Sequence, residues 1–236
     1  MAYKRSLLPV SYAVGEALTS DLIAIGMRLG GVPSADEPNI EDTIVAASIE
    51  GLFQADYRVL SLLVDWFGIH VARVNVDRLT RLVAALDDVR VKAFWVGLAQ
   101  WQKKDSRLKK LQQVPTKFKR GHRFDLMSEG TDFQIERYGE DPRFIGTVLK
   151  VPSKLLRHRP QDIASVAELA KRHLAYSYRI MIGPSYRADM WALVERKPEL
   201  TPTEIARQTY GSFPTAWEVK RDWLLLNNPP QFATAA

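Results

Sequence analysis

Apolar residues in the first hundred positions recur at intervals of three and four, which is the period of amphipathic helices. The pattern predicts helices over residues 11–29, 40–53, 56–70, 75–86 and 91–111. The third of these has almost no polar face and should lie at the centre of a core. Asn75 stands where an N-cap is expected for the fourth. Four or five packed helices should result.

The pattern changes after Val114-Pro115, where scattered aromatics and glycines replace the helical period. The best strand candidates are residues 133–136 and 145–151. Helical periodicity returns at 165–173, which begins with a Ser165-x-x-Glu168 capping-box pattern, and at 185–197. With a junction between about 113 and 130, we expect three parts. These are a helical domain over 1–113, a basic linker and short β-containing middle region over 114–164, and a further domain over 165–236.

The last of these parts contains a pair of closely spaced helix starts. In Thr201-Pro202-Thr203-Glu204, Thr201 can cap, Pro202 suits the first helical position and Glu204 can reach back to the cap. Ile205 and Ala206 then face inward. Ser212 is a second N-cap, and Ala216 and Val219 follow it as inward positions.

Residues 200–225 resemble the helix-turn-helix of bacterial DNA-binding proteins. In that family a small residue in the first helix lets the second helix pack across it, and Ala206 matches it. Ala216 and Val219 match the apolar positions four and seven residues after the second cap. Together with the helical periodicity of the rest of the chain, this predicts a mainly α protein: an N-terminal helical domain, a short α/β middle region and a C-terminal helix-turn-helix, with or without a wing.

The same resemblance implies that the second helix contacts DNA through Ser212, Phe213, Trp217, Lys220 and Arg221. Two features depart from the family pattern. The turn reads Tyr210-Gly211 where the family places glycine before an apolar residue, and Glu218 would bring an anion to the phosphates. Phe213 and Trp217 equally suit a protein contact, because exposed aromatics anchor interfaces.

The net charge of +6 is concentrated in one segment. Residues 103–123 hold nine basic side chains and one acid, Asp105, whereas residues 1–100 hold nine basic and twelve acidic ones. Such a block attracts polyanions, so we predict DNA contacts from Lys103, Lys104, Lys109, Lys110, Lys117, Lys119 and Arg120. A solvated helix end with a linker, or a site for an acidic protein, are the alternatives.

Catalytic and metal-binding motifs are not found. The chain has no cysteine, and its four histidines form no His-x-x-x-His pair, so no metal site is expected. Phosphate-binding glycine loops are missing, and Gly211-Ser212 lacks the paired aspartates of a nucleotidyltransferase site. His70 should be structural. We expect no catalytic residues, no cofactor, no membrane span and a cytoplasmic location.

The order of a helical N-terminal half, a short middle region and a C-terminal helix-turn-helix resembles the antitoxins paired with nucleotidyltransferase toxins of the abortive-infection type. Members of that group can repress their own operon. We therefore expect a DNA-binding transcriptional regulator and antitoxin, with double-stranded DNA and a toxin protein as partners. The alternatives are a protein-interaction module that sequesters a partner without binding DNA, and an enzyme with scattered catalytic residues.

Overall fold

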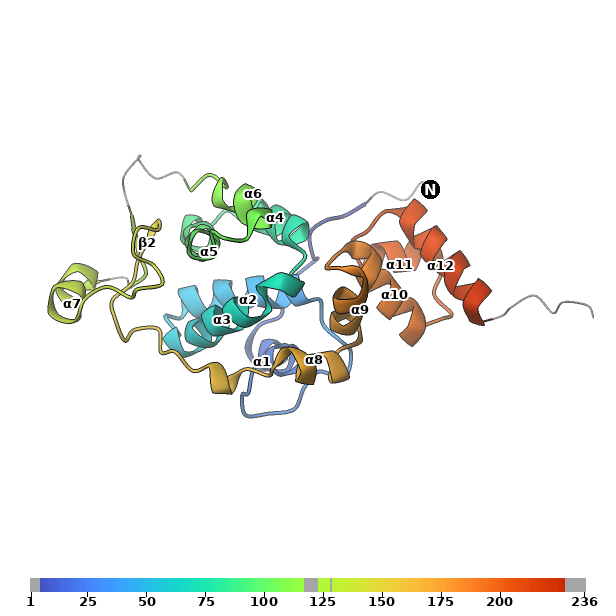
Figure 1. Cartoon of the computed structure of the whole chain (residues 1–236), viewed down its shortest axis with the longest axis horizontal. Helices are drawn as coiled ribbons and strands as arrows, with labels where there is room; N and C mark the ends of the chain where they lie inside the picture. The colour runs from blue at the N-terminus through green and yellow to red at the C-terminus, as the bar shows by residue number, and fades with distance from the viewer. Residues whose placement is uncertain (1–4, 117–122, 128, 228–236) are drawn as a thin grey trace, which may run out of the picture. The chain divides into compact units, whose positions relative to one another are not determined.

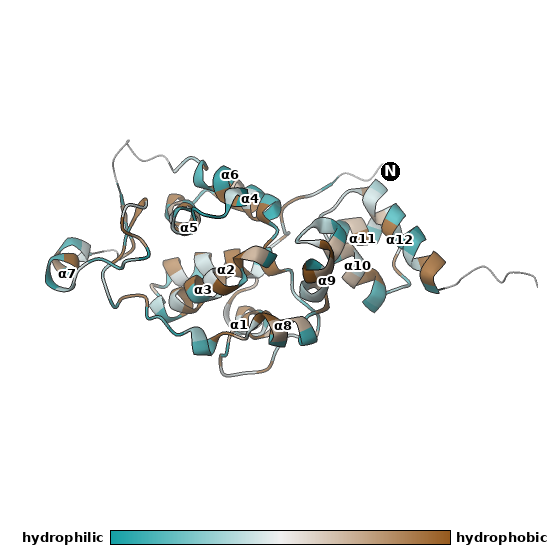
Figure 2. Cartoon of the chain, viewed as in Figure 1, coloured by the Kyte–Doolittle hydropathy of each residue, from teal (hydrophilic) through white to brown (hydrophobic). Residues whose placement is uncertain are grey.

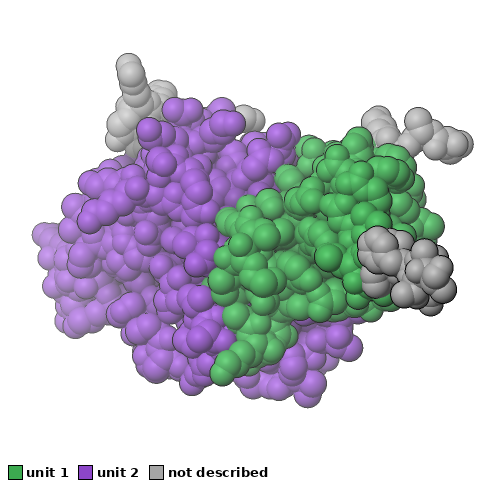
Figure 3. All heavy atoms as spheres, turned by 45° about the vertical axis from the view of Figure 1, so that its right-hand side comes forward, with its two compact units in different colours: residues 1–9, 170–236 green, residues 10–169 purple. Residues whose placement is uncertain are grey.

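The computed structural model describes residues 5–116, 123–127 and 129–227. This part of the chain is mainly helical, as predicted (Figure 1). It divides into two compact units, which are coloured separately in Figure 3. Unit 2 is residues 10–169, and the described part of unit 1 is residues 5–9 together with 170–227. The middle region expected over 114–164 lies within unit 2.

Unit 2 holds the longer series of helices. In chain order they are α1 (Gly15–Ala24), α2 (Ile40–Phe53), α3 (Tyr57–His70), α4 (Val76–Ala85), α5 (Val89–Trp101), α6 (Lys109–Gln112) and α7 (Thr131–Tyr138), with 3₁₀ turns at Val71–Arg73, Ser106–Leu108 and Pro160–Asp162. α8 (Val166–Arg172) follows them and crosses the boundary between the two units, which lies after Leu169. The predicted caps are present, since the Asn75 side chain accepts from Arg78 N, and Ser165 and Glu168 exchange their two hydrogen bonds.

The core of unit 2 is built on α2, α3 and α5. Trp66 and Trp95 are completely buried, and both indole N–H groups are satisfied. Trp66 Nε1 donates to Ile25 O at 2.7 Å, and Trp95 Nε1 donates to Ser48 Oγ at 2.9 Å. Because a buried indole N–H without a partner would be costly, these bonds fix the depth of both rings. α3 is central to the core, as its apolar density predicted.

Residues 133–136 lie in α7, so the predicted strand at this position is wrong. Four alternating residues also fit one turn of a short helix, and glycines with positive φ, Gly130 and Gly139, bound this one. Within 145–151 only β2 (Leu149–Lys150) is extended, and it pairs in parallel with β1 (Phe124–Asp125). The Leu149 side chain lies against Gly97 of α5, where an added Cβ would be 2.5 Å from it.

Unit 1 consists of α9 (Leu174–Ile182), α10 (Tyr186–Arg196), α11 (Pro202–Gln208) and α12 (Phe213–Asn227). The 185–197 prediction corresponds to α10, with Ser185 as its N-cap. α9 was not predicted from the sequence. The core of unit 1 is a cluster of buried side chains from α10, α11 and α12: Met190, Leu193, Val194, Ile205, Ala206, Ala216 and Val219. The described residues of this unit contain no strand.

Candidate functional site

α11 and α12 each begin with the cap that the sequence predicted. Thr201 and Glu204 form a reciprocal capping box, and hydrogen bonds from Thr201 hold the pKa of the Glu204 carboxyl below its usual value. Ser212 Oγ accepts from Thr215 N at 3.3 Å, so it caps α12. These caps set where each helix begins and therefore which side chains reach its exposed face.

The turn between the two helices uses Tyr210 and Gly211 differently from the family pattern. Tyr210 has a φ of 58°, the left-handed conformation that glycine adopts most readily. Gly211 instead packs closely on α10, since an added Cβ would lie 2.0 Å from Met190 Cε and would displace the end of that side chain. Arg5 Nε donates to Tyr210 O at 2.8 Å, and its guanidinium lies over the Tyr186 ring. The turn is therefore also held by the N-terminal segment of unit 1.

α12 presents an apolar stripe to solvent. Phe213 is 40% exposed, Trp217 is 49% exposed and Leu224 is 41% exposed. Their spacing of four and seven residues puts them on one side of the helix. Leu225 and Leu226 extend the apolar surface at the C-terminal end of α12, which is brown in Figure 2. Exposed apolar side chains gathered on one side of a helix are a common feature of surfaces that bind other molecules.

The acidic side chains of α12 are paired with arginines. Arg187 of α10 bonds Glu218 at 3.4 Å through Nη1 and Asp222 at 3.2 Å through Nη2. Arg221 also bonds Asp222, at 2.7 Å. Hydrogen bonding from Arg221, helped by the positive charge of Arg187, holds the pKa of Asp222 below its usual value. Both acids thus have arginine partners, which reduces the repulsion that Glu218 would offer to an anionic ligand.

The two basic residues predicted to contact DNA from α12 have partners within unit 1. Lys220 Nζ donates to Pro198 O and lies over the Trp223 ring. The Arg221 guanidinium lies 5.3 Å from the centroid of the Trp217 ring and remains half exposed. Arg221 therefore lies over the apolar stripe of α12, whereas Lys220 supports the loop between α10 and α11.

The basic block is divided between structural and exposed side chains. Arg107 bonds Asp105 and the Val71 carbonyl, and this hydrogen bonding holds the pKa of Asp105 below its usual value. Arg123 is tied to Glu140 and to backbone carbonyls. Lys103 and Lys104 follow α5, Lys109 and Lys110 lie on α6, and all four are exposed. Lys117, Lys119 and Arg120 lie outside the described residues.

Three arginines that contribute to charged surfaces were not identified as such from the sequence. Arg187 pairs with acids 31 and 35 residues away, and no local pattern marks that contact. Arg157 and Arg159, which flank His158, line a pocket in unit 2. Their adjacency in the sequence was a usable signal, because alternating cations on an extended segment point to a basic surface.

The described residues contain no cluster of histidine and acidic side chains that could hold a metal ion. His70 is fully buried, and its Nε2 lies 3.1 Å from the Ala164 carbonyl oxygen, in keeping with the predicted structural role. Within the part of the chain that is described, no helix is long and apolar enough to cross a membrane.

No family model matches the chain, and it matches neither a curated protein nor a solved structure.

Proposed function

We propose that unit 1 is a helix-turn-helix domain that binds double-stranded DNA through α12, and that the protein is a transcriptional regulator. The observation that carries the proposal is the close packing of α11 on α12. Ala206 is completely buried together with Ala216 and Val219, while the opposite side of α12 is open to solvent. In a helix-turn-helix the second helix enters the major groove with such an exposed face.

The side chains along that face support the proposal. Arg221 can donate to base edges or phosphates, and Phe213 and Trp217 offer apolar contact to thymine methyl groups. Arg187 compensates Glu218 and Asp222, so the acids on α12 do not carry uncompensated charge to the duplex. Lys103, Lys104, Lys109 and Lys110 add exposed positive charge in unit 2, which favours nonspecific attraction to DNA.

The test uses a duplex from the promoter of the protein's own operon and a scrambled duplex of equal length, with fluorescence anisotropy as the readout. Arg221→Ala should weaken binding to the promoter duplex by about 1–3 kcal/mol if Arg221 contacts a base. Glu218→Gln should strengthen binding to both duplexes, because it removes an anion and frees Arg187. Arg196→Ala, on α10, is the matched control and should bind normally. Unchanged promoter affinity in Arg221→Ala would remove α12 from DNA recognition.

A second candidate function is supported by the apolar stripe itself. Phe213, Trp217 and Leu224 could anchor α12 in a groove of a partner protein. The resemblance to antitoxins suggests a nucleotidyltransferase toxin, encoded by the neighbouring gene, as that partner. Under this function Trp217→Ala and Phe213→Ala should each cost about 2 kcal/mol or more in binding the toxin. They should also abolish rescue of growth when both genes are expressed, while Arg221→Ala keeps it.

A further inference from the structure

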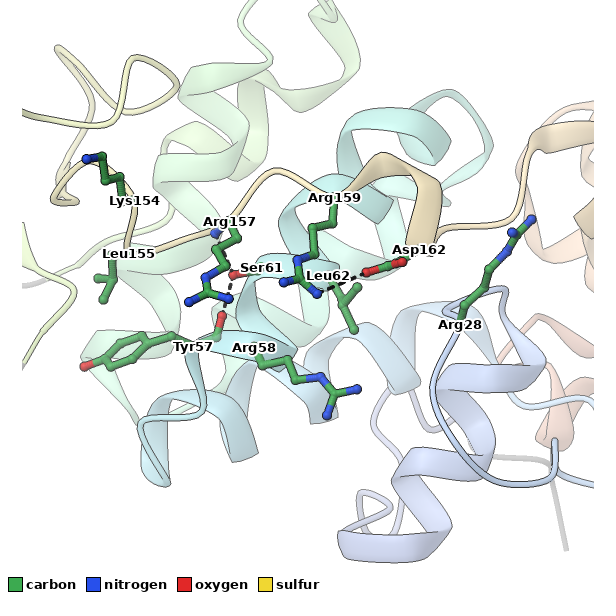
Figure 4. Close-up of a pocket in the computed structure, with 10 residues that line it drawn as sticks. All are labelled: Arg28, Tyr57, Arg58, Ser61, Leu62, Lys154, Leu155, Arg157, Arg159 and Asp162. Atoms are coloured by element: carbon green, nitrogen blue, oxygen red, sulfur yellow. Dashed lines mark hydrogen bonds and ion pairs between the residues drawn. The ribbon is translucent and has the colours of Figure 1, made fainter.

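Unit 2 contains a basic pocket between α3 and the segment 154–162 (Figure 4). Its volume is about 340 Å³, within the range of small-ligand sites. Its cationic lining residues are Arg28, Arg58, Lys154, Arg157 and Arg159. Asp162 is the one acidic side chain among the residues described as lining it. This excess of positive charge in a concave site favours an anionic ligand.

The segment that carries Arg157 and Arg159 is fixed to α3 by hydrogen bonds. Arg157 N donates to Ser61 Oγ at 3.0 Å, and Arg159 N donates to the Asp65 carboxylate. Asp65 is almost completely buried, and His158 Nδ1 lies 2.8 Å from its Oδ1. These contacts hold the backbone in place, so the two arginine side chains project from a preorganised segment.

Arg58 and Arg157 are available for a ligand. Neither has a carboxylate partner among the residues that the structure describes. Arg159 Nη1 lies 3.8 Å from Asp162 Oδ2, and both side chains are partly exposed. An ion pair at this separation and exposure is weak. In Figure 4, Arg157 and Arg159 extend from the 154–162 segment towards α3, which carries Arg58. Guanidinium groups pair with phosphate oxygens in a bidentate manner, which makes arginine well suited to phosphate binding.

The rest of the lining is aromatic and aliphatic. Tyr57 is half-buried at the start of α3, Leu62 is buried on the same helix, and Leu155 is half-buried on the facing segment. A ligand that satisfies the whole pocket therefore needs an apolar or aromatic moiety as well as charge. Aromatic rings and guanidinium planes both stack on nucleobases.

We propose that this pocket binds a nucleoside diphosphate or triphosphate. The terminal phosphate carries roughly −1.5 to −2 charges near neutral pH, and each internal phosphate adds about one more negative charge, so a chain of phosphates matches the cations at Arg58, Arg157 and Arg159. The base would lie against Tyr57, Leu62 and Leu155. A concave site with an apolar wall suits a small nucleotide better than it suits the convex backbone of a duplex. The proposal does not rest on DNA binding by unit 1.

The test is isothermal titration calorimetry of the full chain with ADP at about 150 mM salt, an ionic strength that screens long-range attraction. Wild-type protein should bind one ADP per chain. Arg58→Gln and Arg157→Gln should each weaken binding at least about tenfold, because each removes a charge-assisted contact. Both side chains are exposed, so thermal melting should be unchanged. Arg81→Gln, which removes a half-exposed arginine of α4, is the matched control and should bind like wild type.

Adenosine and pyrophosphate separate the two halves of the ligand. Both should bind at least about tenfold more weakly than ADP, since each lacks one set of contacts. Undiminished ADP binding in the Arg58→Gln, Arg157→Gln double variant would overturn the proposal, as would pyrophosphate binding as tight as that of ADP. Duplex DNA that displaces ADP, and whose own affinity falls in the double variant, would assign the pocket to a nucleic-acid backbone instead.

Discussion

Burial of His70 should make the stability of unit 2 depend on pH. His70 is the last residue of α3, and its Nε2 donates to the Ala164 carbonyl oxygen at 3.1 Å. Burial lowers the pKa of His70 from 6.5 to about 4, although the bond to Ala164 opposes the change. The unfolded chain keeps the ordinary value, because its histidine is hydrated. Between these two pKa values only the unfolded chain binds the proton.

The direction and size of the effect follow from this difference. As pH falls below about 6.5, protonation stabilises the unfolded chain while His70 in the folded chain stays neutral, so stability is lost on acidification. One pKa unit corresponds to about 1.4 kcal/mol. The free energy of unfolding should therefore fall by about 2 kcal/mol between pH 7 and pH 5 from His70 alone, and by about 3 kcal/mol at pH 4.

Urea denaturation of wild type and His70→Gln at pH 7, 6 and 5 measures this contribution. The glutamine amide can still donate to Ala164 O but does not titrate. His70→Gln should be less stable at pH 7, yet it should lose about 2 kcal/mol less than wild type on going to pH 5. Carboxylates that titrate in the same range cancel in this comparison. Identical pH dependence in the two proteins would refute a buried, neutral His70.

Three further predictions concern packing and charge. Ala206→Leu should overpack the crossing of α11 and α12 and lower the free energy of unfolding by an amount on the order of 1–3 kcal/mol, measured by thermal unfolding. Ala84→Leu, on an exposed face of α4, is the control and should cost little. A fully stable Ala206→Leu protein would contradict the packing described for unit 1. Gly97→Ala should push the Leu149 side chain and cost about 1–3 kcal/mol in urea denaturation. Gly30→Ala, with nothing within 4 Å of the added methyl group, is its control, and equal costs would mean that α5 and β2 do not pack closely. Replacing Lys103, Lys104, Lys109 and Lys110 by glutamine should flatten the dependence of log Kd for duplex DNA on log salt by about 0.9 per lost phosphate contact. An unchanged slope, as expected for Arg81→Gln, would remove the basic block from DNA binding.

Helices with local signals could be predicted from the sequence. The bounds of α2 agree with the prediction, and Asn75, Thr201 and Ser212 cap where expected, because capping depends on residues three positions apart. The helix predicted over 91–111 was too long, because α5 ends at Trp101 and Asp105 caps a separate 3₁₀ turn. α9 was missed because Ile180, Met181 and Ile182 are all exposed, so its apolar residues do not mark a buried face.

The candidate sites could be predicted only where one segment forms them. The exposed face of α12 follows from its own period and cap. The compensation of Glu218 requires Arg187 from another helix, and the basic pocket combines α3 with residues some hundred positions later in the chain. Contacts of that kind depend on how the helices pack against one another, and this packing cannot be predicted from the local pattern of a single sequence.

The two parts that form unit 1 are separated by all of unit 2. Arg5 bonds the turn carbonyl of Tyr210, at a sequence separation of 205 residues. During synthesis residues 10–169 are complete before residues 170–227 have been made. Unit 2 can therefore fold on the ribosome while the N-terminal segment still lacks the helices against which it packs. A folded unit 2 then shortens the loop that must close when Arg5 reaches Tyr210, which lowers the entropic cost of that step. Chain order thus allows unit 2 to fold before the candidate DNA-binding unit is complete.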